Sequence, residues 1–178
     1  MTARSRSVLE TGRIRLRPTT EDDLEFVMSL ERDPENAPFI LRWPVDDHLT
    51  AISDPDRAHL MVEAKDTGRD IGYVILAALQ SPHRSIEFVR ITVARKGEGY
   101  GRECLRAIKR MAFDSLGAQR LWLDVMSHNA RARSLYLAEG FVEEGTLRQS
   151  VELDGRRVSL IVLSMLEHEF RQEQERAG

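Results

Sequence analysis

Glycine occupies three alternate positions in the middle of the chain, at Gly97, Gly99 and Gly101. Residues 85–93 before them alternate as a strand does, and residues 102–116 after them carry apolar side chains at helical spacing. Glycine permits positive φ and lets a ligand approach the main chain, and N–H groups at a helix start can cradle an anion. The feature predicts a strand, a loop and a helix that bind a phosphorylated ligand. A glycine-rich connector without a ligand is the plainer alternative.

Two other phosphate-binding loops fit this stretch less well. The nucleotide P-loop needs Gly-Lys followed by Ser or Thr, and the sequence contains no such tripeptide. A dinucleotide fingerprint read from Gly99 reaches Cys104 where a third small residue is required, although Asp124 could mimic its acidic residue. The antiparallel hairpins expected before the glycines do not build a doubly wound nucleotide domain.

Composition limits the class of protein. The chain has 178 residues, 42% of them apolar and 31% charged, with a net charge of −3, which is typical of a globular protein and gives no reason to expect a nucleic-acid partner. No apolar run approaches the ~18 residues of a membrane span, and Met1 to Val8 lacks the apolar core of a secretory signal. We therefore expect a cytoplasmic protein without a membrane partner.

Cysteine and histidine usage argues against a metal site. Cys104 is the only cysteine, so an internal disulfide cannot form, and its helical neighbours favour a buried thiol over a nucleophile. No two of the five histidines stand four residues apart, as a metal pair on a helix would.

The pattern along the rest of the chain predicts one domain, 1–178, with an α/β (α+β) fold and a mixed, mostly antiparallel sheet. Short helical turns and loops are expected over 32–56, and the charged segment 167–178 is expected to fray. We expect strands near 12–18, 59–64, 71–79, 85–93, 121–126, 146–153 and 158–166, and helices near 19–31, 102–116 and 129–138.

The run from Lys96 to Gly101 resembles the Arg/Gln-x-x-Gly-x-Gly/Ala loop of the GNAT superfamily of N-acetyltransferases, with lysine in the first place. The resemblance continues through 121–125 and 128–136, Gly140-Phe141 and Glu144-Gly145, and covers about 12–166. It implies a GNAT fold of about seven strands flanked by helices, with a V-shaped split between the fourth and fifth strands. It also implies transfer of acetyl from acetyl-coenzyme A to a primary amine, by direct attack in a ternary complex.

The resemblance assigns the cofactor site residue by residue. The backbone from Gly97 to Gly101, with Arg102, would bind the pyrophosphate, and a strand edge would pair with the pantetheine arm as in β-augmentation. Asn129 would hydrogen-bond that arm, although an N-cap for its own helix is an equal alternative. The residues expected to bind acetyl-coenzyme A are Ile91, Thr92, Val93, Lys96, Gly97, Glu98, Gly99, Tyr100, Gly101, Arg102 and Asn129.

Two residues are expected to carry the chemistry. A lysine-type amine of pKa ~10.4 is neutral in about one molecule in 2,500 at pH 7, so a general base matters. Glu87 is the candidate, because Glu87, Val89, Ile91 and Val93 are predicted to share one face of the strand before the glycines, and the family often has a carboxylate there that acts through water. A solvent-facing or ion-paired Glu87 is the alternative.

Tyr136 resembles the family tyrosine that donates a proton to the sulfur of coenzyme A. An ordinary phenol of pKa ~10 is protonated at neutral pH, so the role is chemically sensible. Simple packing in the core is the alternative for this side chain.

The sequence does not determine which amine is the acceptor. Between 21 and 56 there are eleven acids against Arg32 and Arg42, which favours a cationic acceptor. The segments 141–145 and Asp154-Gly155 look similar to the ribosomal-protein alanine acetyltransferase branch, so a protein N-terminus is one candidate, with polyamines, amino acids and antibiotics equally open. A coenzyme A sensor without turnover is the rival function, and a homodimer is an open expectation.

Overall fold

The computed structural model describes residues 8–177. The sequence predicts no secretory signal over residues 1–8, and residues 1–7 of that stretch lie outside the described range. One eight-stranded sheet runs through the described part, in the order β1-β2-β3-β4-β5-β6-β8-β7. Neighbouring strands are antiparallel except β5 and β6, which are parallel. The strands are β1 (Leu9–Glu10), β2 (Ile14–Pro18), β3 (Arg57–Ala64), β4 (Arg69–Ala77), β5 (Ser85–Val93), β6 (Arg120–Met126), β7 (Val142–Leu153) and β8 (Arg156–Leu166).

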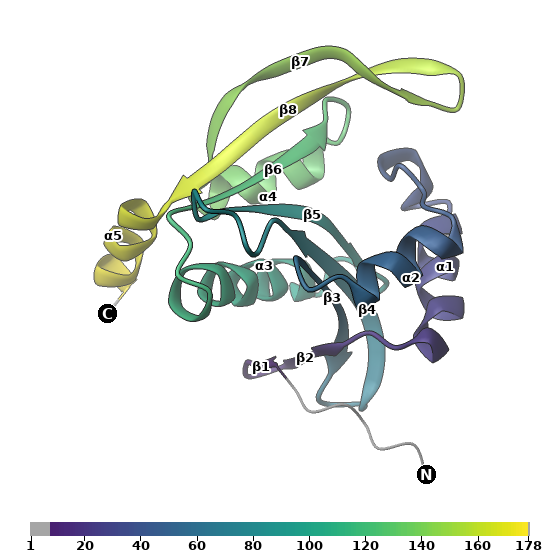
Figure 1. Cartoon of the computed structure of the whole chain (residues 1–178), viewed down its shortest axis with the longest axis horizontal. Helices are drawn as coiled ribbons and strands as arrows, with labels where there is room; N and C mark the ends of the chain where they lie inside the picture. Colours follow the sequence, from purple (N-terminus) through teal and green to yellow (C-terminus); the bar gives the residue numbers. More distant parts are fainter. Residues whose placement is uncertain (1–7, 178) are drawn as a thin grey trace.

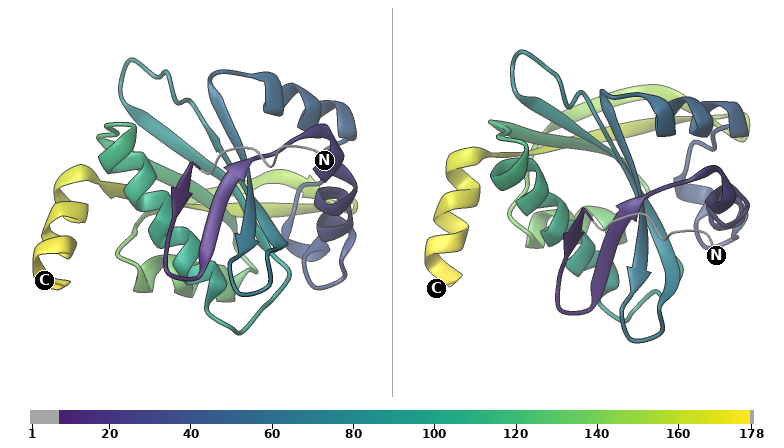
Figure 2. Two further views of the ribbon diagram at one scale, coloured as in Figure 1. Left: turned by 90° about the horizontal axis from the view of Figure 1, so that it is seen from below. Right: turned by 60° about the horizontal axis from the view of Figure 1, so that its bottom comes forward.

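Helices cover both faces of the sheet (Figures 1 and 2). The face under α3 holds the larger apolar cluster, which includes Leu105 and Ile108, and the face under α1 holds a smaller one around Val27, Leu30 and Tyr73. The helices are α1 (Leu24–Arg32), α2 (Val45–Ser53), α3 (Tyr100–Arg110), α4 (Ala130–Ala138) and α5 (Glu167–Ala177), with short turns at Glu21–Asp23, Ala37–Phe39 and Met111–Ser115.

The seven predicted strands and three predicted helices follow one another in the predicted order, and the structure adds two helices, α2 and α5, and one strand. The added strand is β1, which is only two residues long and pairs with β2. Because β1 precedes every predicted strand, the pair that we expected to be the fourth and fifth strands is β5 and β6. Cys104 is fully buried, and burial raises its pKa to about 12, so it is the inert thiol that the sequence predicts.

The prediction that 167–178 frays is wrong over the described part of that segment. It forms α5, whose Phe170 is 1% exposed and stacks on Phe113 with ring centroids 4.8 Å apart. Lys109 Nζ also lies 2.7 Å from Glu173 of this helix. A single aromatic residue docks a helix whose other residues are largely polar. The segment 32–56 is likewise more regular than expected, because it contains the nine-residue α2.

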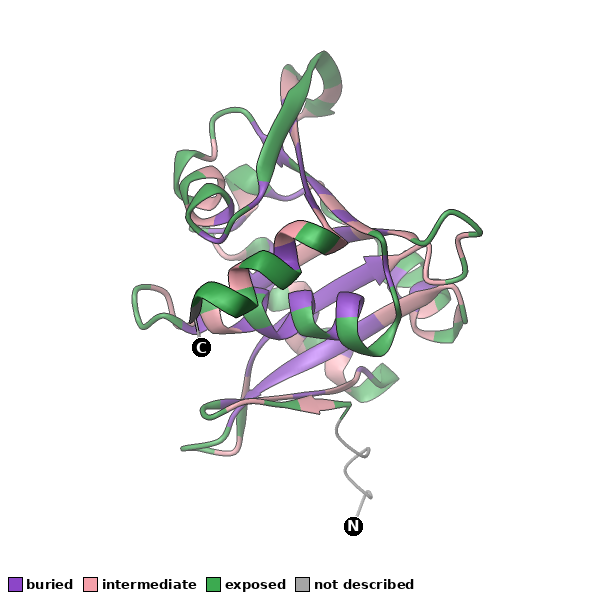
Figure 3. Ribbon diagram, turned by 90° about the vertical axis from the view of Figure 1, so that its left-hand side faces the viewer, coloured by how far each residue is buried: buried purple, intermediate pink, exposed green. Residues whose placement is uncertain are grey.

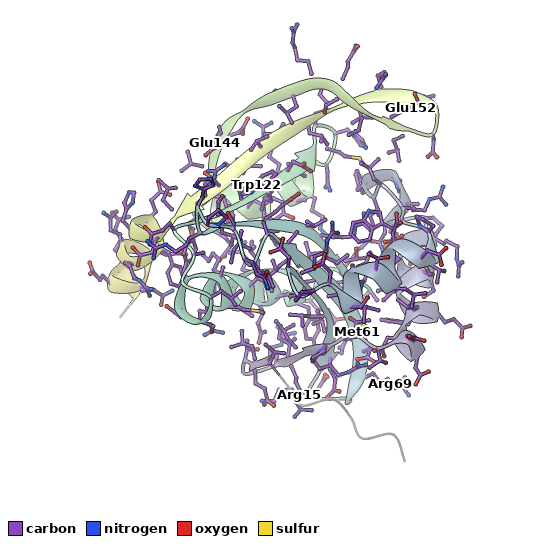
Figure 4. All side chains as sticks on the ribbon, in the orientation of Figure 1. Arg15, Met61, Arg69, Trp122, Glu144 and Glu152 are labelled. Carbon is purple, nitrogen blue, oxygen red and sulfur yellow. The ribbon has the colours of Figure 1, made fainter. Side chains whose placement is uncertain are left out.

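The two last strands form a long hairpin that arches over β6 toward the side of α1 and α2 (Figure 1). Asp154 and Gly155 at its turn both have positive φ, 48° and 75°, as a two-residue hairpin loop requires. Figure 3 shows β7 as largely exposed, and Figure 4 shows Glu144 and Glu152 far apart along the hairpin. Asp154 Oδ1 lies 3.8 Å from Arg42, so the turn reaches the loop between α1 and α2.

Candidate active site

The sheet splits between its two parallel strands. β5 and β6 pair only from Ser85 to Glu87, opposite Arg120 to Trp122, and beyond Glu87 each strand continues without the other. A cavity of about 950 Å³ occupies the split and reaches the glycine-rich loop. A β-bulge in β5 lies next to the point of divergence, because Ile75 of β4 pairs with Arg90 while Leu76 pairs with Phe88. A bulge bends the strand that contains it, so it helps to separate β5 from β6.

This bulge corrects the predicted face of β5. Val89 is the extra residue, and after it the alternation is reversed. Ile91 and Val93 pack against the apolar cluster under α3, whereas Val89 packs against the cluster under α1. The prediction that Glu87, Val89, Ile91 and Val93 share one face is therefore wrong after Val89. A bulge shifts the pleat by one residue, and the residue pattern alone did not reveal it.

The glycine-rich loop has the geometry of an anion cradle. Gly97 and Gly99 have φ of 80° and 83°, and Gly99 is the N-cap of α3. An added Cβ at Gly97 would meet nothing within 4 Å, so the main chain there is open to a ligand. The first N–H groups of α3 lack partners within the helix and favour negative charge. Arg95 lies beside the loop with its Cζ 4.9 Å from the centre of the Tyr100 ring, and it pairs with Glu98 of the loop. These features fit the pyrophosphate of acetyl-coenzyme A.

The cavity collects the predicted cofactor residues with one exception. The Glu98 side chain turns away and pairs with Arg95 at 2.7 Å, while its carbonyl accepts from Arg13 at 3.0 Å. The predicted residues that line the cavity are Ile91, Thr92, Val93, Lys96, Gly97, Gly99, Tyr100, Gly101, Arg102 and Asn129, together with Glu87 and Tyr136.

Asn129 serves as an N-cap while it lines the cavity. Its side-chain oxygen accepts from the Ala132 N–H at 3.2 Å, at the start of α4. The N-cap alternative is therefore confirmed, and this bond fixes Asn129 at the edge of the split.

Glu87 lies at the closed end of the split and is half-buried. Burial raises its pKa, the negative charge of Asp124 raises it further, and Arg57 partly opposes both. Within the described residues neither Glu87 nor Asp124 forms an ion pair, so both remain free to meet a cation.

Asp124 is a site residue that sequence reasoning missed. It was considered only as the acid of a nucleotide fingerprint. Leu121, Leu123 and Val125 of β6 are buried, so the alternation turns Asp124 to the other side of the strand. The side chain opens onto the cavity, yet the surrounding protein still raises its pKa by removing water. The alternation of buried residues along β6 could have indicated that Asp124 faces away from the apolar core. Only the pairing of β6 with β5 shows that the cavity lies on that side.

Tyr136 extends from α4 into the same cavity. It is 7% exposed, and its ring meets Phe141 edge-on with centroids 5.9 Å apart. Burial raises its pKa, with smaller contributions from Cys104 and Asp124, so the phenol stays protonated at neutral pH. The residue thus packs in the core and still reaches the split.

The wall on the side of α1 and α2 is made by the loop before α2 and by Arg90. Leu41, Trp43 and Arg90 line the cavity there. His128, on the other side of the split, meets this loop: its ring lies 5.4 Å from that of Phe39, and its Nε2 lies 2.8 Å from the Pro38 carbonyl. The sequence indicated only irregular structure in this loop, so Trp43 was missed. Arg90, on β5, was missed as well.

Two negative observations hold for the described residues, 8–177. No group of three or more histidine, cysteine, aspartate or glutamate side chains is placed there to hold a metal ion. None of the helices in that range combines the length and the apolar character needed to cross a membrane.

Comparison with known proteins places these features in one family. The family described as "Acetyltransferase (GNAT) domain" matches residues 13–142, which is more than half of the chain. The spermidine N(1)-acetyltransferase of Vibrio cholerae is 28% identical over 152 residues, covering 82% of this chain and 88% of that protein. The N-acetyltransferase YoaA of Bacillus subtilis, itself uncharacterized, is 26% identical over 170 residues, covering 89% and 96%.

Solved structures agree with the sequence relatives. The crystal structure of the Vibrio cholerae spermidine N-acetyltransferase in complex with CoA and spermine superposes with a TM-score of 0.80 at 26% identity, covering 90% of this chain and 99% of that one. The split sheet, the glycine cradle and the family match agree with one another. The chain belongs to the GNAT family of acetyltransferases, and it is an acetyl-coenzyme A-dependent N-acetyltransferase.

Proposed function

We propose that this enzyme acetylates a small primary amine that is positively charged at neutral pH. The observation that carries the proposal is the pair of unpaired carboxylates, Glu87 and Asp124, in the cavity that also reaches the glycine cradle. Negative charge in a partly dry cleft attracts a cation. The names of the relatives support polyamines as the first acceptors to test, since spermidine is the substrate in the name of the Vibrio cholerae protein.

The chain's own groups would hold acetyl-coenzyme A at the opposite end of the cavity. The N–H groups from Gly97 to Gly101, with Arg102, would bind the pyrophosphate. The edge of β5 that faces the split, from Ile91 to Val93, has no neighbouring strand and would pair with the pantetheine arm. Bound in this way, acetyl-coenzyme A supplies an acetyl thioester that an amine can attack directly.

Glu87 would act as the general base. Its raised pKa brings it closer to that of an ammonium group, which makes proton removal less unfavourable than it would be for an ordinary carboxylate. Asp124 would attract the ammonium to this end of the cavity. The proton passes from the amine to Glu87 through a water molecule, and the nitrogen lone pair becomes free to attack.

Tyr136 would give a proton to the departing sulfur and regain one from solvent. Burial raises the pKa of the phenol, which keeps it protonated but makes it a weaker acid. The same dry surroundings disfavour a free thiolate beside it, which offsets that loss and favours the transfer. The phenol Oη is the donor and the coenzyme A sulfur is the acceptor.

Release of free thiol from acetyl-coenzyme A tests the proposal. We expect turnover with spermidine and little with a neutral peptide amide or an amino acid. Turnover of a peptide with an N-terminal alanine alone would favour the ribosomal-protein branch instead. Calorimetric binding of acetyl-coenzyme A without thiol release from any amine would support the sensor.

Variants test the two catalytic roles. Tyr136→Phe should lower kcat more than about threefold, because it removes the hydroxyl that donates the proton and keeps the ring. Glu87→Gln should abolish the acidic limb of the pH profile of kcat/KM. Glu152→Gln, on the exposed part of the hairpin, is the control and should behave like wild type. A Tyr136→Phe enzyme with kcat close to wild type would contradict the proton-donor role.

The homodimer remains a prediction. Light scattering of the purified enzyme measures the mass of the particle, and a monomeric mass would contradict it.

A further inference from the structure

Arg90 brings a positive charge to the wall of the proposed acceptor site. Its side chain is 9% exposed, and its Nη2 donates to the Leu41 carbonyl at 2.6 Å. The guanidinium lies over the Trp43 ring, 4.8 Å from its centre. All three residues line the cavity. A net positive charge there would oppose the entry of an ammonium group.

Glu31, in the last turn of α1, is the group that meets this charge. It is fully buried, and one carboxylate oxygen accepts from Arg90 Nη1 and from the Tyr73 hydroxyl, the latter at 2.6 Å. The other oxygen accepts from the Trp43 backbone N–H at 3.2 Å. Burial alone would raise the pKa of Glu31, but His48, Arg90 and Tyr73 together lower it, so Glu31 is ionised at neutral pH.

Two buried histidines, His48 and His59, close the far side of this group. His59 Nδ1 lies 2.8 Å from Thr19 Oγ1, and its Nε2 lies 3.0 Å from His48 Nδ1. Burial, with the nearby His48 and Arg90, lowers the pKa of His59 to about 4, so His59 is neutral at pH 7. His48 Nε2 approaches Glu31 to 3.3 Å.

We propose that Glu31 is a positioning residue that sets the charge of the acceptor site without touching the acceptor. It cancels the charge of Arg90 and fixes Arg90 and the Trp43 backbone in the wall. Glu87 and Asp124 are then the carboxylates that an entering amine meets at that end of the cavity, where Arg57 only partly opposes their charge. This inference rests on the proposed function, namely that the acceptor is a cation.

The reason for the arrangement lies in the shape of the wall. Arg90 holds the loop before α2 through the Leu41 carbonyl, and no apolar side chain could donate to that oxygen. A cation is therefore structurally useful at a place where it would repel the substrate. A buried carboxylate that accepts from the same guanidinium resolves this conflict, since a paired arginine keeps its donors but loses its net charge.

Kinetics with spermidine and three variants test the proposal. Glu31→Gln keeps the volume of the side chain but removes its charge, so KM for spermidine should rise about tenfold, the size expected from one poorly screened like charge. The kcat and the KM for acetyl-coenzyme A should change less than about twofold. Arg90→Gln removes the cation but keeps an N–H donor for the Leu41 carbonyl, so KM for spermidine should stay equal or fall. The double variant Glu31→Gln/Arg90→Gln should bring KM back to within about threefold of wild type.

Each other result has a definite meaning. If wild type acetylates no cationic amine, the proposed function fails first. If wild type turns over spermidine but Glu31→Gln leaves KM unchanged, the inference is overturned and the proposed function stands. If the double variant binds spermidine as poorly as Glu31→Gln, Glu31 acts by packing alone. Should Glu31→Gln not fold, Arg90→Gln decides, because it keeps a donor for the Leu41 carbonyl and a rise in its KM for spermidine contradicts the charge-setting role.

Discussion

Lowering the pH from 7 to 5 should destabilise the fold through His59, a buried histidine behind the acceptor wall. Burial, assisted by the nearby His48 and Arg90, lowers its pKa from 6.5 to about 4. Between these two values the unfolded chain binds a proton that the folded chain excludes, so the free energy of unfolding falls as the pH drops. With those pKa values the contribution of His59 falls by about 2 kcal/mol between pH 7 and pH 5.

Urea unfolding followed by circular dichroism at both pH values measures this loss. The fold also lowers the pKa of Glu31, so the informative quantity is the difference between wild type and His59→Gln. Glutamine does not titrate, and wild type should therefore lose about 2 kcal/mol more than the variant over this range. His83→Gln, at an exposed position on the β4–β5 loop, should lose as much as wild type. If His59→Gln loses as much as wild type, His59 is not excluded from protonation and the reasoning is refuted.

Two further changes probe the split. Asp124→Asn removes a negative charge that helps to raise the pKa of Glu87, so the acidic limb of kcat/KM should move to lower pH; an unmoved limb would mean that the two carboxylates do not interact. Gly72→Ala would place a Cβ 2.3 Å from the Thr92 carbonyl oxygen and push β4 from β5, lowering the free energy of unfolding by about 1–3 kcal/mol. Gly12→Ala, where a Cβ meets nothing within 4 Å, is the matched control, and equal stability of the two variants would contradict this steric argument.

The cofactor half of the candidate site could be read from the sequence because it is local. A strand, alternate glycines and a helix follow one another within about 30 residues, and positive φ at Gly97 and Gly99 is a property of the loop itself. The hairpin at Asp154-Gly155 was predictable for the same reason, since turn type depends on the two residues at the turn. Tyr136 was found only through its resemblance to the family.

The acceptor half depends on contacts between distant segments. Asp124 faces the same cavity as Glu87 because β6 pairs in parallel with β5 across an intervening helix. Glu31 meets Arg90 although 59 residues separate them. Neither pairing leaves a periodic pattern in the chain, since each partner alone looks like an ordinary charged residue.

The sequence by itself determined the strand and helix order, the anion cradle and the turn of the last hairpin, because each depends on residues close together in the chain. Only the tertiary structure decided three things: the face of β5 after its bulge, the docking of α5 through Phe170, and the charge of the acceptor wall. The physical reason is that register, burial and ion pairing are settled between segments that meet only when the sheet has formed.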